Sequence, residues 1–353
     1  MPARPYQSRF YQSLSHFAAK PRETPAILGL KCLEFEMTVA DMQLLPRNMT
    51  THETVKTPVV SYFENCRRYR LRVCKVDNTT TAITDAEWAV LPGYWPENIQ
   101  VNINNTPIQL LRKHRFHFDL PAELTPHVRQ GTNTVKISLP DSKSNIIEGS
   151  TYFAAVEIVT TLSHEAVIDL VQTTPPCTLE QTRNEISKRQ GLAGQGDDDL
   201  MITDDSLVVT VADPFTSCIF TIPVRGINCQ HLECFDLDNW LQTRPSKANL
   251  IAEDSRQEPS LADNWRCPLC GEDARPQSLR IDELFVGIRS ILESKGKLDV
   301  KKIRISSNGS WTALEESPRA SVDRQRPESQ GDMKGEKRAI ITSTTEVIEL
   351  DDD

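Results

Sequence analysis

The chain has 353 residues, of which 38% are hydrophobic and 25% are charged, so it has room for two ordinary domains and linkers. Its net charge of −9 argues against nucleic-acid binding along the whole chain and leaves direct DNA binding through a local basic patch open. The nine cysteines, odd in number and unevenly spread, argue against a disulfide framework and favour a reducing compartment, and the chain has no apolar run long enough for a membrane span, so we expect no membrane association.

The N-terminal segment, residues 1–27, is basic and has no acidic residue before Glu23. We expect it to be disordered rather than a transit peptide, because short basic N-termini usually lack packing partners.

Residues 28–172 contain short segments in which apolar and polar residues alternate, which is the pattern of strands with one buried face. The turn residues Asn104 and Asn105 separate two of these segments. Regularly spaced short strands with turns between them predict an all-β sandwich over this range. The apolar positions are Leu33, Phe35, Met37 and Val39; Tyr69, Leu71 and Val73; Ile99, Val101 and Ile103; and Val135, Ile137 and Leu139.

Arg68, Arg70 and Arg72 alternate with the apolar residues of the second segment. Such a stripe either forms the solvated outer face of a half-buried strand or presents a basic surface to an acidic partner or to phosphates. We expect the solvated face, because arginines are mostly exposed.

Two further stretches lack a periodic apolar pattern. Residues 173–204 combine prolines and glycines with the acidic run at 197–199, which is typical of a linker. Residues 313–353 are rich in Ser, Glu, Arg and Pro, and we expect a disordered tail.

Candidate metal ligands gather between these two stretches, where Cys229 and His231 form one pair and Cys267 and Cys270 form a Cys-x-x-Cys pair. Sulfur and imidazole ligands at these spacings favour one structural zinc ion. Cys218 and Cys234 either replace one of these ligands or remain unligated thiols. The six candidates are too few for the eight ligands of two ions, so one ion is expected.

The flanks of these pairs predict a small α+β zinc module over residues 205–294, with a short extension at 295–312. Residues 219–224 predict a hairpin arm in which Pro223 is tolerable only at an edge. Asp236 precedes a short helical segment, and Asp282 is a candidate N-cap before a second helix. The apolar stripe of that second helix comprises Ile281, Leu284, Phe285, Ile288, Ile291 and Leu292.

The order and spacing of these residues resemble the MIZ or SP-RING finger of PIAS and Siz type SUMO ligases. The motifs that carry the resemblance are Pro214-Phe215, Ile222-Pro223-Val224-Arg225-Gly226, Cys229-x-His231-x-x-Cys234-Phe235-Asp236, Trp265-x-Cys267-Pro268-x-Cys270 and Leu279-x-Ile281-Asp282-x-Leu284-Phe285. The resemblance implies one zinc held by Cys229, His231, Cys267 and Cys270, and no metal at the second site of a RING.

The chain departs from this family pattern at two places. Many relatives have a cysteine where this chain has Asp213, a position that is not a zinc ligand in the family. Residues 242–263 form a longer insertion than most relatives have, and we expect it to loop out without consequence.

Upstream, Trp95-Pro96-Glu97-Asn98-Ile99 and the segment 131–137 resemble a divergent PINIT domain, which agrees with the predicted sandwich and implies a contribution to substrate choice. We recognise no SAP-like DNA-binding module in the sequence.

The resemblance implies a SUMO E3 ligase that orients a charged conjugating enzyme (E2) and SUMO towards protein substrates, such as chromatin proteins or transcription factors, in the nucleus. It places the E2 contact on Phe215, Pro268 and Leu269, with Trp265 backing this surface. Two alternatives remain: a transcriptional co-regulator or scaffold that uses the finger for protein binding alone, and a ubiquitin ligase.

The C-terminal tail contains two further motifs. The segment 347–353 resembles a SUMO-interacting motif, in which an apolar strand adds to a sheet edge and acidic residues face a basic surface. Its residues are Val347, Ile348, Leu350, Asp351, Asp352 and Asp353. Lys334 lies in an apolar-Lys-x-Glu pattern that predicts automodification.

Overall fold

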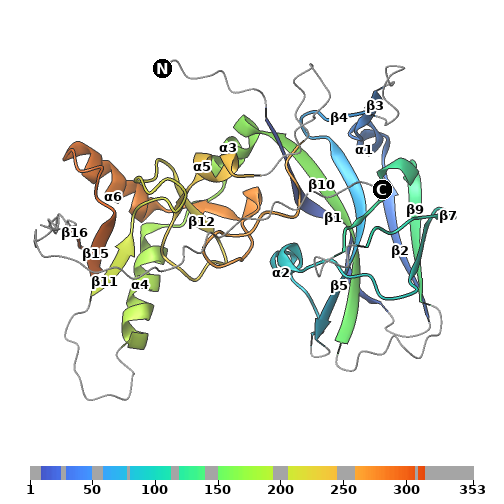
Figure 1. The fold of residues 1–353 in the computed structure, drawn as a ribbon, viewed down its shortest axis with the longest axis horizontal. Helices are drawn as coiled ribbons and strands as arrows, with labels where there is room; N and C mark the ends of the chain where they lie inside the picture. The colour runs from blue at the N-terminus through green and yellow to red at the C-terminus, as the bar shows by residue number, and fades with distance from the viewer. Residues whose placement is uncertain are drawn as a thin grey trace, which may run out of the picture. The chain divides into compact units, whose positions relative to one another are not determined.

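The computed structural model describes residues 9–24, 29–49, 59–77, 80–112, 119–139, 150–193, 206–244, 259–306 and 309–314. The fold is mainly β, as predicted (Figure 1). No helix within these ranges is both long and apolar enough to cross a bilayer.

Two four-stranded antiparallel sheets form the predicted sandwich (Figure 1). The first sheet has the order β1 (Phe10–Thr24), β10 (Ser150–Ser163), β5 (Arg67–Asp77) and β8 (Ala122–Glu123). The second has the order β2 (Gly29–Met37), β9 (Gly131–Leu139), β6 (Gln100–Ile103) and β7 (Thr106–Pro107). One apolar core joins them and contains the predicted alternating residues of β2, β5, β6 and β9.

Val39 is the exception among these predicted core residues. It lies in helix α1 (Val39–Gln43) and is 54% exposed. The Thr38 side chain accepts a hydrogen bond from the amide of Asp41, and the Asp41 carboxylate accepts one from the amide of Thr38. This capping box ends the strand at Met37 and starts a helix. A small two-stranded sheet, β3 (Arg47–Met49) and β4 (Val59–Ser61), follows.

The expectation that residues 1–27 are disordered is wrong for Phe10–Thr24, which form the edge strand β1 of the first sheet. Tyr11 and Leu14 are buried at 1% and 2% exposure. The register of β1 against β10 shifts at three places. Such bulges break the period of two, which explains why the sequence carries no clear strand signal here.

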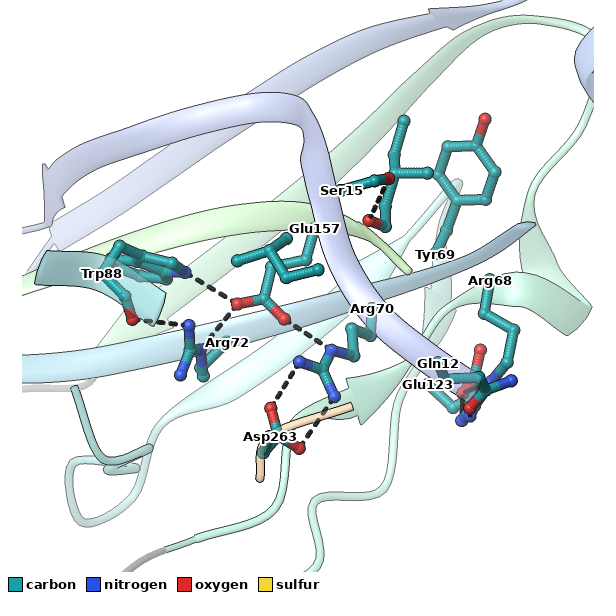
Figure 2. Close-up of polar contacts among 12 residues, drawn as sticks. Gln12, Ser15, Arg68, Tyr69, Arg70, Arg72, Trp88, Glu123, Glu157 and Asp263 are labelled. Atoms are coloured by element: carbon teal, nitrogen blue, oxygen red, sulfur yellow. Dashed lines mark hydrogen bonds and ion pairs between the residues drawn. The ribbon is translucent and has the colours of Figure 1, made fainter. Parts of the chain in front are cut away.

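The expectation of a solvated arginine stripe is wrong for Arg70 and Arg72, whereas the Arg68 side chain is 29% exposed. Arg70 and Arg72 are 6% and 4% exposed, and Glu157 on β10 lies between them with no exposed surface (Figure 2). Trp88 of helix α2 (Asp85–Val90) covers this outer face and donates a hydrogen bond from Nε1 to Glu157. A second small apolar cluster therefore lies on the face that was expected to meet solvent.

Residues 173–204, expected to be a linker, contain ordered structure over their described part. Helix α3 (His164–Thr173) ends the sandwich, and helix α4 (Leu179–Ala193) follows. Thr182 and Ile186 of α4 have no exposed surface, and the amide of Glu283 donates a hydrogen bond to the carbonyl of Cys177. The helix has a weakly amphipathic sequence, and its packing against the zinc module orders it.

The zinc module contains two three-stranded antiparallel sheets (Figure 1). One has the order β13 (Phe235–Asp236), β12 (Pro223–Gly226) and β14 (Leu279–Ile281), and the other has the order β11 (Ser206–Thr210), β15 (Lys302–Ser306) and β16 (Trp311–Leu314). The predicted extension 295–312 thus supplies β15 and most of the β15–β16 hairpin. Pro223 begins the central strand β12 rather than an edge strand, and the first residue of a strand tolerates proline.

The two predicted helices of this module are confirmed. Helix α5 (Leu237–Gln242) has Asp236 as its N-cap, and helix α6 (Glu283–Ser294) has Asp282 as its N-cap. Leu284, Phe285, Ile288 and Leu292 are buried. Ile291, which was included in the buried stripe, is 42% exposed.

Candidate metal centre

The structure brings Cys229, His231, Cys267 and Cys270 together. Their candidate ligand atoms all lie within 4.8 Å of one another. The Sγ atoms of Cys229 and Cys270 are 3.6 Å apart, and Nε2 of His231 lies 3.2 Å from Sγ of Cys267. Sulfurs at about 2.3 Å from a tetrahedral zinc are about 3.7 Å from each other, so the donor set and its spacing fit a closed zinc site.

A turn after β12 delivers the first pair of ligands. The amide of Cys229 donates to the carbonyl of Gly226 over 3.0 Å. A Cβ at position 226 would meet the carbonyl oxygen of Asp273 at 2.5 Å and Sγ of Cys229 at 3.0 Å. Glycine is therefore required where this turn passes beneath the second loop, residues 267–273, which carries Cys267 and Cys270.

The orientation of His231 is fixed by its other ring nitrogen, since Nδ1 lies 2.8 Å from the carbonyl oxygen of Glu233. A carbonyl can only accept, so Nδ1 carries the proton and Nε2 presents its lone pair to the three sulfurs. This is the tautomer that a metal ligand requires.

The second pair lies on a tight turn closed by hydrogen bonds from the amide of Cys267 to Glu272 and from Gly271 to Cys267. Gly271 has a φ of 81°, which favours glycine. A hydrogen bond from Cys229 lowers the pKa of Cys267 to about 4, and His231 and the amides of Leu269 and Cys270 contribute to this effect against burial. Burial raises the pKa of Cys270, and the hydrogen bond with Cys267 raises that of Cys229, so these contacts favour one thiolate, at Cys267, the form that binds a metal.

Cys218 and Cys234 do not join this group within the described part of the chain. Cys234 is 1% exposed in the apolar cluster of Phe220 and Phe285, and burial raises its pKa well above the ordinary value. Cys218 is exposed. The structure therefore favours the unligated alternative for both thiols.

The first loop, residues 213–218, is held together by Asp213, which is 1% exposed. Its carboxylate accepts hydrogen bonds from the amide of Thr216 at 3.0 Å, the amide of Asp236 at 3.0 Å and the side chain of Asn239 at 3.2 Å. This residue, noted from the sequence only as a departure from relatives, ties the first loop to helix α5. The only local sequence signal of this arrangement is an Asp three residues before the Thr whose amide donates to it.

A buried ion pair on the other side of β12 was not predicted. Nε of Arg225 lies 3.2 Å from Oδ2 of Asp282, which also accepts a hydrogen bond from Thr182 over 2.9 Å. Burial raises the pKa of Asp282, although Arg225 and Thr182 oppose this effect. The pair joins strand β12 to the start of α6, and the Thr182 hydrogen bond attaches helix α4 to the same carboxylate.

The residues expected to contact the E2 divide into two groups. Phe215 and Leu269 are 41% and 44% exposed, and Pro268 is exposed as well. Trp265 is 2% exposed, so it is unavailable for direct contact and belongs to the core beneath the two loops.

Stacked rings connect the two loops. The Phe215 ring stacks on Trp240 with centroids 5.8 Å apart, and the Arg244 guanidinium lies 3.3 Å from the Trp240 centroid and 5.8 Å from that of Trp265. Exposed apolar side chains thus project from loops that are anchored to a common core. The predicted SUMO-interacting motif at 347–353 and Lys334 lie outside the described residues.

Comparison with known proteins finds relatives that are similar to part of this sequence. Human zinc finger MIZ domain-containing protein 2 is 24% identical over 230 residues, which cover 64% of this chain and 22% of that protein. E3 SUMO-protein ligase SIZ1 of Saccharomyces cerevisiae is 26% identical over 200 residues, covering 55% of this chain and 18% of the relative. E3 SUMO-protein ligase PIAS2 of Rattus norvegicus is 31% identical over 118 residues, covering 33% and 17%.

Among solved structures, the crystal structure of the S. cerevisiae SUMO E3 ligase SIZ1 matches 86% of this chain and 92% of that chain at 20% identity, with a TM-score of 0.36. A scan against protein-family models finds no match. The chain spans about a fifth of the length of the curated relatives it matches. The resemblance inferred from the sequence is confirmed, because the homologues are MIZ-domain proteins and PIAS and Siz SUMO ligases.

Proposed function

We propose that this homologue of the PIAS and Siz proteins is a SUMO E3 ligase. It binds the charged SUMO-conjugating enzyme through its zinc module and promotes SUMO transfer to substrate lysines without a covalent intermediate of its own. The names of relatives such as SIZ1, SIZ2 and PIAS2 support the activity. The arrangement of the two loops supports the mode of action.

The observation that carries this proposal is the pair of exposed apolar side chains, Phe215 and Leu269, on two loops that converge on one anchored core. A lone globular module gains nothing from leaving such side chains in water, and rigid apolar residues are typical of interaction hot spots. We assign Phe215, Pro268 and Leu269 to the E2 contact. Trp265 supports this surface from below.

Such a ligase acts through orientation. The reactive thioester belongs to a cysteine of the conjugating enzyme, so this chain needs no nucleophile. Holding the thioester and the incoming lysine in reactive geometry removes much of the entropic barrier. Rigid loops are therefore a direct requirement of the mechanism, and the Asp213 contacts of the first loop supply rigidity there.

Cys229, His231, Cys267 and Cys270 would hold one zinc ion. With three sulfurs and one imidazole the site would have no open position, so the ion would supply structural cross-linking alone. It would join the turn after β12 to the knuckle, the hydrogen-bonded turn of residues 267–272 that carries Pro268 and Leu269.

The partners follow from this activity: SUMO, its conjugating enzyme and protein substrates, with chromatin proteins or transcription factors as the proposed class and the nucleus as the proposed compartment. Residues 347–353 are proposed to bind SUMO, and Lys334 is a proposed automodification site. Lys334→Arg should lower automodification, whereas full modification of that variant would remove the assignment.

A protein-binding scaffold is the second candidate. The MIZ-domain relatives favour it, since their names state a zinc finger and no ligase activity. The same exposed loops would then bind a partner without stimulating transfer.

A reconstituted conjugation reaction separates these two functions. Purified SUMO-activating and conjugating enzymes, SUMO and substrate are combined with wild type, Cys267→Ser or Phe215→Ala. We expect both variants to lose product formation relative to wild type. Equal product from all three proteins would exclude the ligase and favour the scaffold, and the same assay with ubiquitin enzymes tests a ubiquitin ligase.

A further inference from the structure

The free edge of strand β1 is covered by the zinc module. The carbonyl oxygens of Phe10, Gln12 and Leu14 accept hydrogen bonds from donors that lie some 250 residues later in the chain, 253 residues for Gln12 and 261 for Leu14. Alternate residues of a strand direct their backbone groups to the same side. All three carbonyls therefore belong to the edge that faces away from β10.

The donors reach this edge in order along the strand. The amide of Ser260 donates to Phe10 at 3.1 Å, and Nε1 of Trp265 donates to Gln12 at 2.6 Å. Arg275 and Gln277 both donate to Leu14, at 3.1 and 2.7 Å. In return, the amide of Gln12 donates to Oγ of Ser260 over 3.3 Å.

These donors flank the candidate metal ligands. Trp265 lies two positions before Cys267, and the carboxylate of Asp273, which has no exposed surface, accepts hydrogen bonds from Nε and Nη2 of Arg275. The knuckle thus has two sides, because Pro268 and Leu269 are exposed while its flanking residues bind β1.

An ion pair strengthens the same contact. Asp263 binds Arg70 of β5 through two hydrogen bonds of 2.9 and 2.5 Å, and Glu157 holds Arg70 from the other side (Figure 2). Burial, which is only partial because 41% of the side chain is exposed, raises the pKa of the Asp263 carboxyl, but the charge and hydrogen bonds of Arg70 outweigh this and keep the pKa below its ordinary value. The carboxylate is therefore ionised at neutral pH.

The segment 259–263 is the end of the insertion that was expected to loop out without consequence. That expectation is wrong for these residues, since Pro259 and Ser260 are buried and Asp263 forms the ion pair. Tyr11 of β1 also joins the apolar cluster of the zinc module, with its ring centroid 6.2 Å from that of Trp265. The contact is thus apolar as well as polar, and the hydrogen bonds from Trp265 and Arg275 to β1 are buried, which keeps water from competing for them.

We propose that the residues flanking the knuckle, namely Trp265, Arg275 and Gln277, and the segment 259–263 cap the edge of β1 and thereby join the sandwich and the zinc module into one rigid body. Asp263 and Gln277 are positioning residues in this interface. An uncapped edge strand is a liability, and here the zinc module removes it. One consequence of the cap rests on the proposed function. A substrate held by the sandwich would present only those lysines that lie at a fixed distance from the E2-binding loops.

Residue-resolved amide hydrogen exchange tests the cap without reference to activity. The amides of Gln12 and Ser260 report the interface, and those of Leu71 and Ile137 report the sandwich core. In Asp263→Asn/Gln277→Ala we expect about tenfold faster exchange at the first two amides and no change at the other two, because the loss of two hydrogen-bonding groups favours local opening by about that factor. Unchanged exchange at Gln12 and Ser260 would overturn the proposal.

Two further variants make this result specific. Glu123→Gln removes one partner of Arg68 within the sandwich and leaves the hydrogen bond from Arg68 to the Gln12 side chain, so the four amides should exchange as in wild type. Ser260→Ala removes only the acceptor of the Gln12 amide. It should speed exchange at Gln12 even if the double variant does not fold, and no effect there would again contradict the cap.

An activity measurement distinguishes a failed cap from a failed ligase. Discharge of SUMO from the charged E2 to free lysine reports the zinc module, and the pattern of modified lysines on a folded substrate reports its position relative to the sandwich. We expect the double variant to keep the discharge rate and to spread modification to additional lysines. If the wild-type protein does not stimulate discharge, the ligase proposal is rejected and the cap is unaffected. If the double variant discharges SUMO normally and modifies the same lysines as wild type, the positioning role is rejected.

Discussion

Nδ1 of His231 donates its hydrogen to the carbonyl oxygen of Glu233 across 2.8 Å. This one bond turns Nε2 toward the sulfurs of Cys229, Cys267 and Cys270. A backbone carbonyl two residues away thus decides which atom of the imidazole is available to a metal, and the Cys-x-His spacing is short enough for the chain to make this contact locally.

The first prediction concerns the metal. Purified protein should contain one zinc per chain, and Cys267→Ser should lower this content to near zero because three ligands of a structural site bind zinc far more weakly than four. Elemental analysis measures both. Cys218→Ser is the matched control and should keep the ion, since Cys218 is exposed and lies outside the group.

The second prediction concerns the buried ion network. Glu157→Ala should destabilise the chain by about 3–5 kcal/mol, because it leaves the guanidinium groups of Arg70 and Arg72 buried without their shared carboxylate. Urea denaturation followed by tryptophan fluorescence measures the free energy of unfolding. Glu123→Gln, at a partly exposed pair, should stay within about 1 kcal/mol of wild type, and equal losses for both variants would contradict the assignment.

The third prediction concerns the first loop. Asp213→Ala removes the acceptor for Thr216, Asp236 and Asn239, so the loop should open and SUMO transfer should fall while zinc content stays at one per chain. Asp213→Asn retains one acceptor oxygen, so its rate of SUMO transfer should lie between those of wild type and Asp213→Ala. If Asp213→Ala transfers SUMO at the wild-type rate, loop rigidity has no part in the activity.

The fourth prediction concerns pH. The pKa of Asp263 is lowered in the folded protein, so its contribution to stability is present above the unfolded value of about 4 and is lost as pH falls through the folded value. The stability difference between wild type and Asp263→Asn should therefore be constant from neutral pH down to about 5 and shrink at lower pH. A difference that grows on acidification would contradict the ion pair.

The sequence predicted the features that depend on local pattern. Two-residue periodicity located β2, β5, β6 and β9, the helical stripe located α6, and cysteine and histidine spacing selected the four residues that the structure brings together. Each of these signals lies within a few residues of chain.

The failures share one physical cause, which is burial by distant segments. Arg70 and Arg72 sit on a face that looks solvated in their own strand, and α2 and the segment 259–263 cover it from elsewhere in the chain. Helix α4 is ordered by packing on the zinc module. Strand β1 is bulged on one edge and capped on the other. None of these contacts produces a periodic apolar pattern in the local sequence.

The most direct measurement for the proposed activity is single-turnover discharge of SUMO from its charged conjugating enzyme to free lysine. We expect the wild-type chain to accelerate discharge, Leu269→Ala and Phe215→Ala to lose most of that acceleration, and Leu30→Ala, at a 63% exposed residue of the sandwich, to retain it. Loss of acceleration in all three variants, or in none, would contradict a docking surface formed by the two loops.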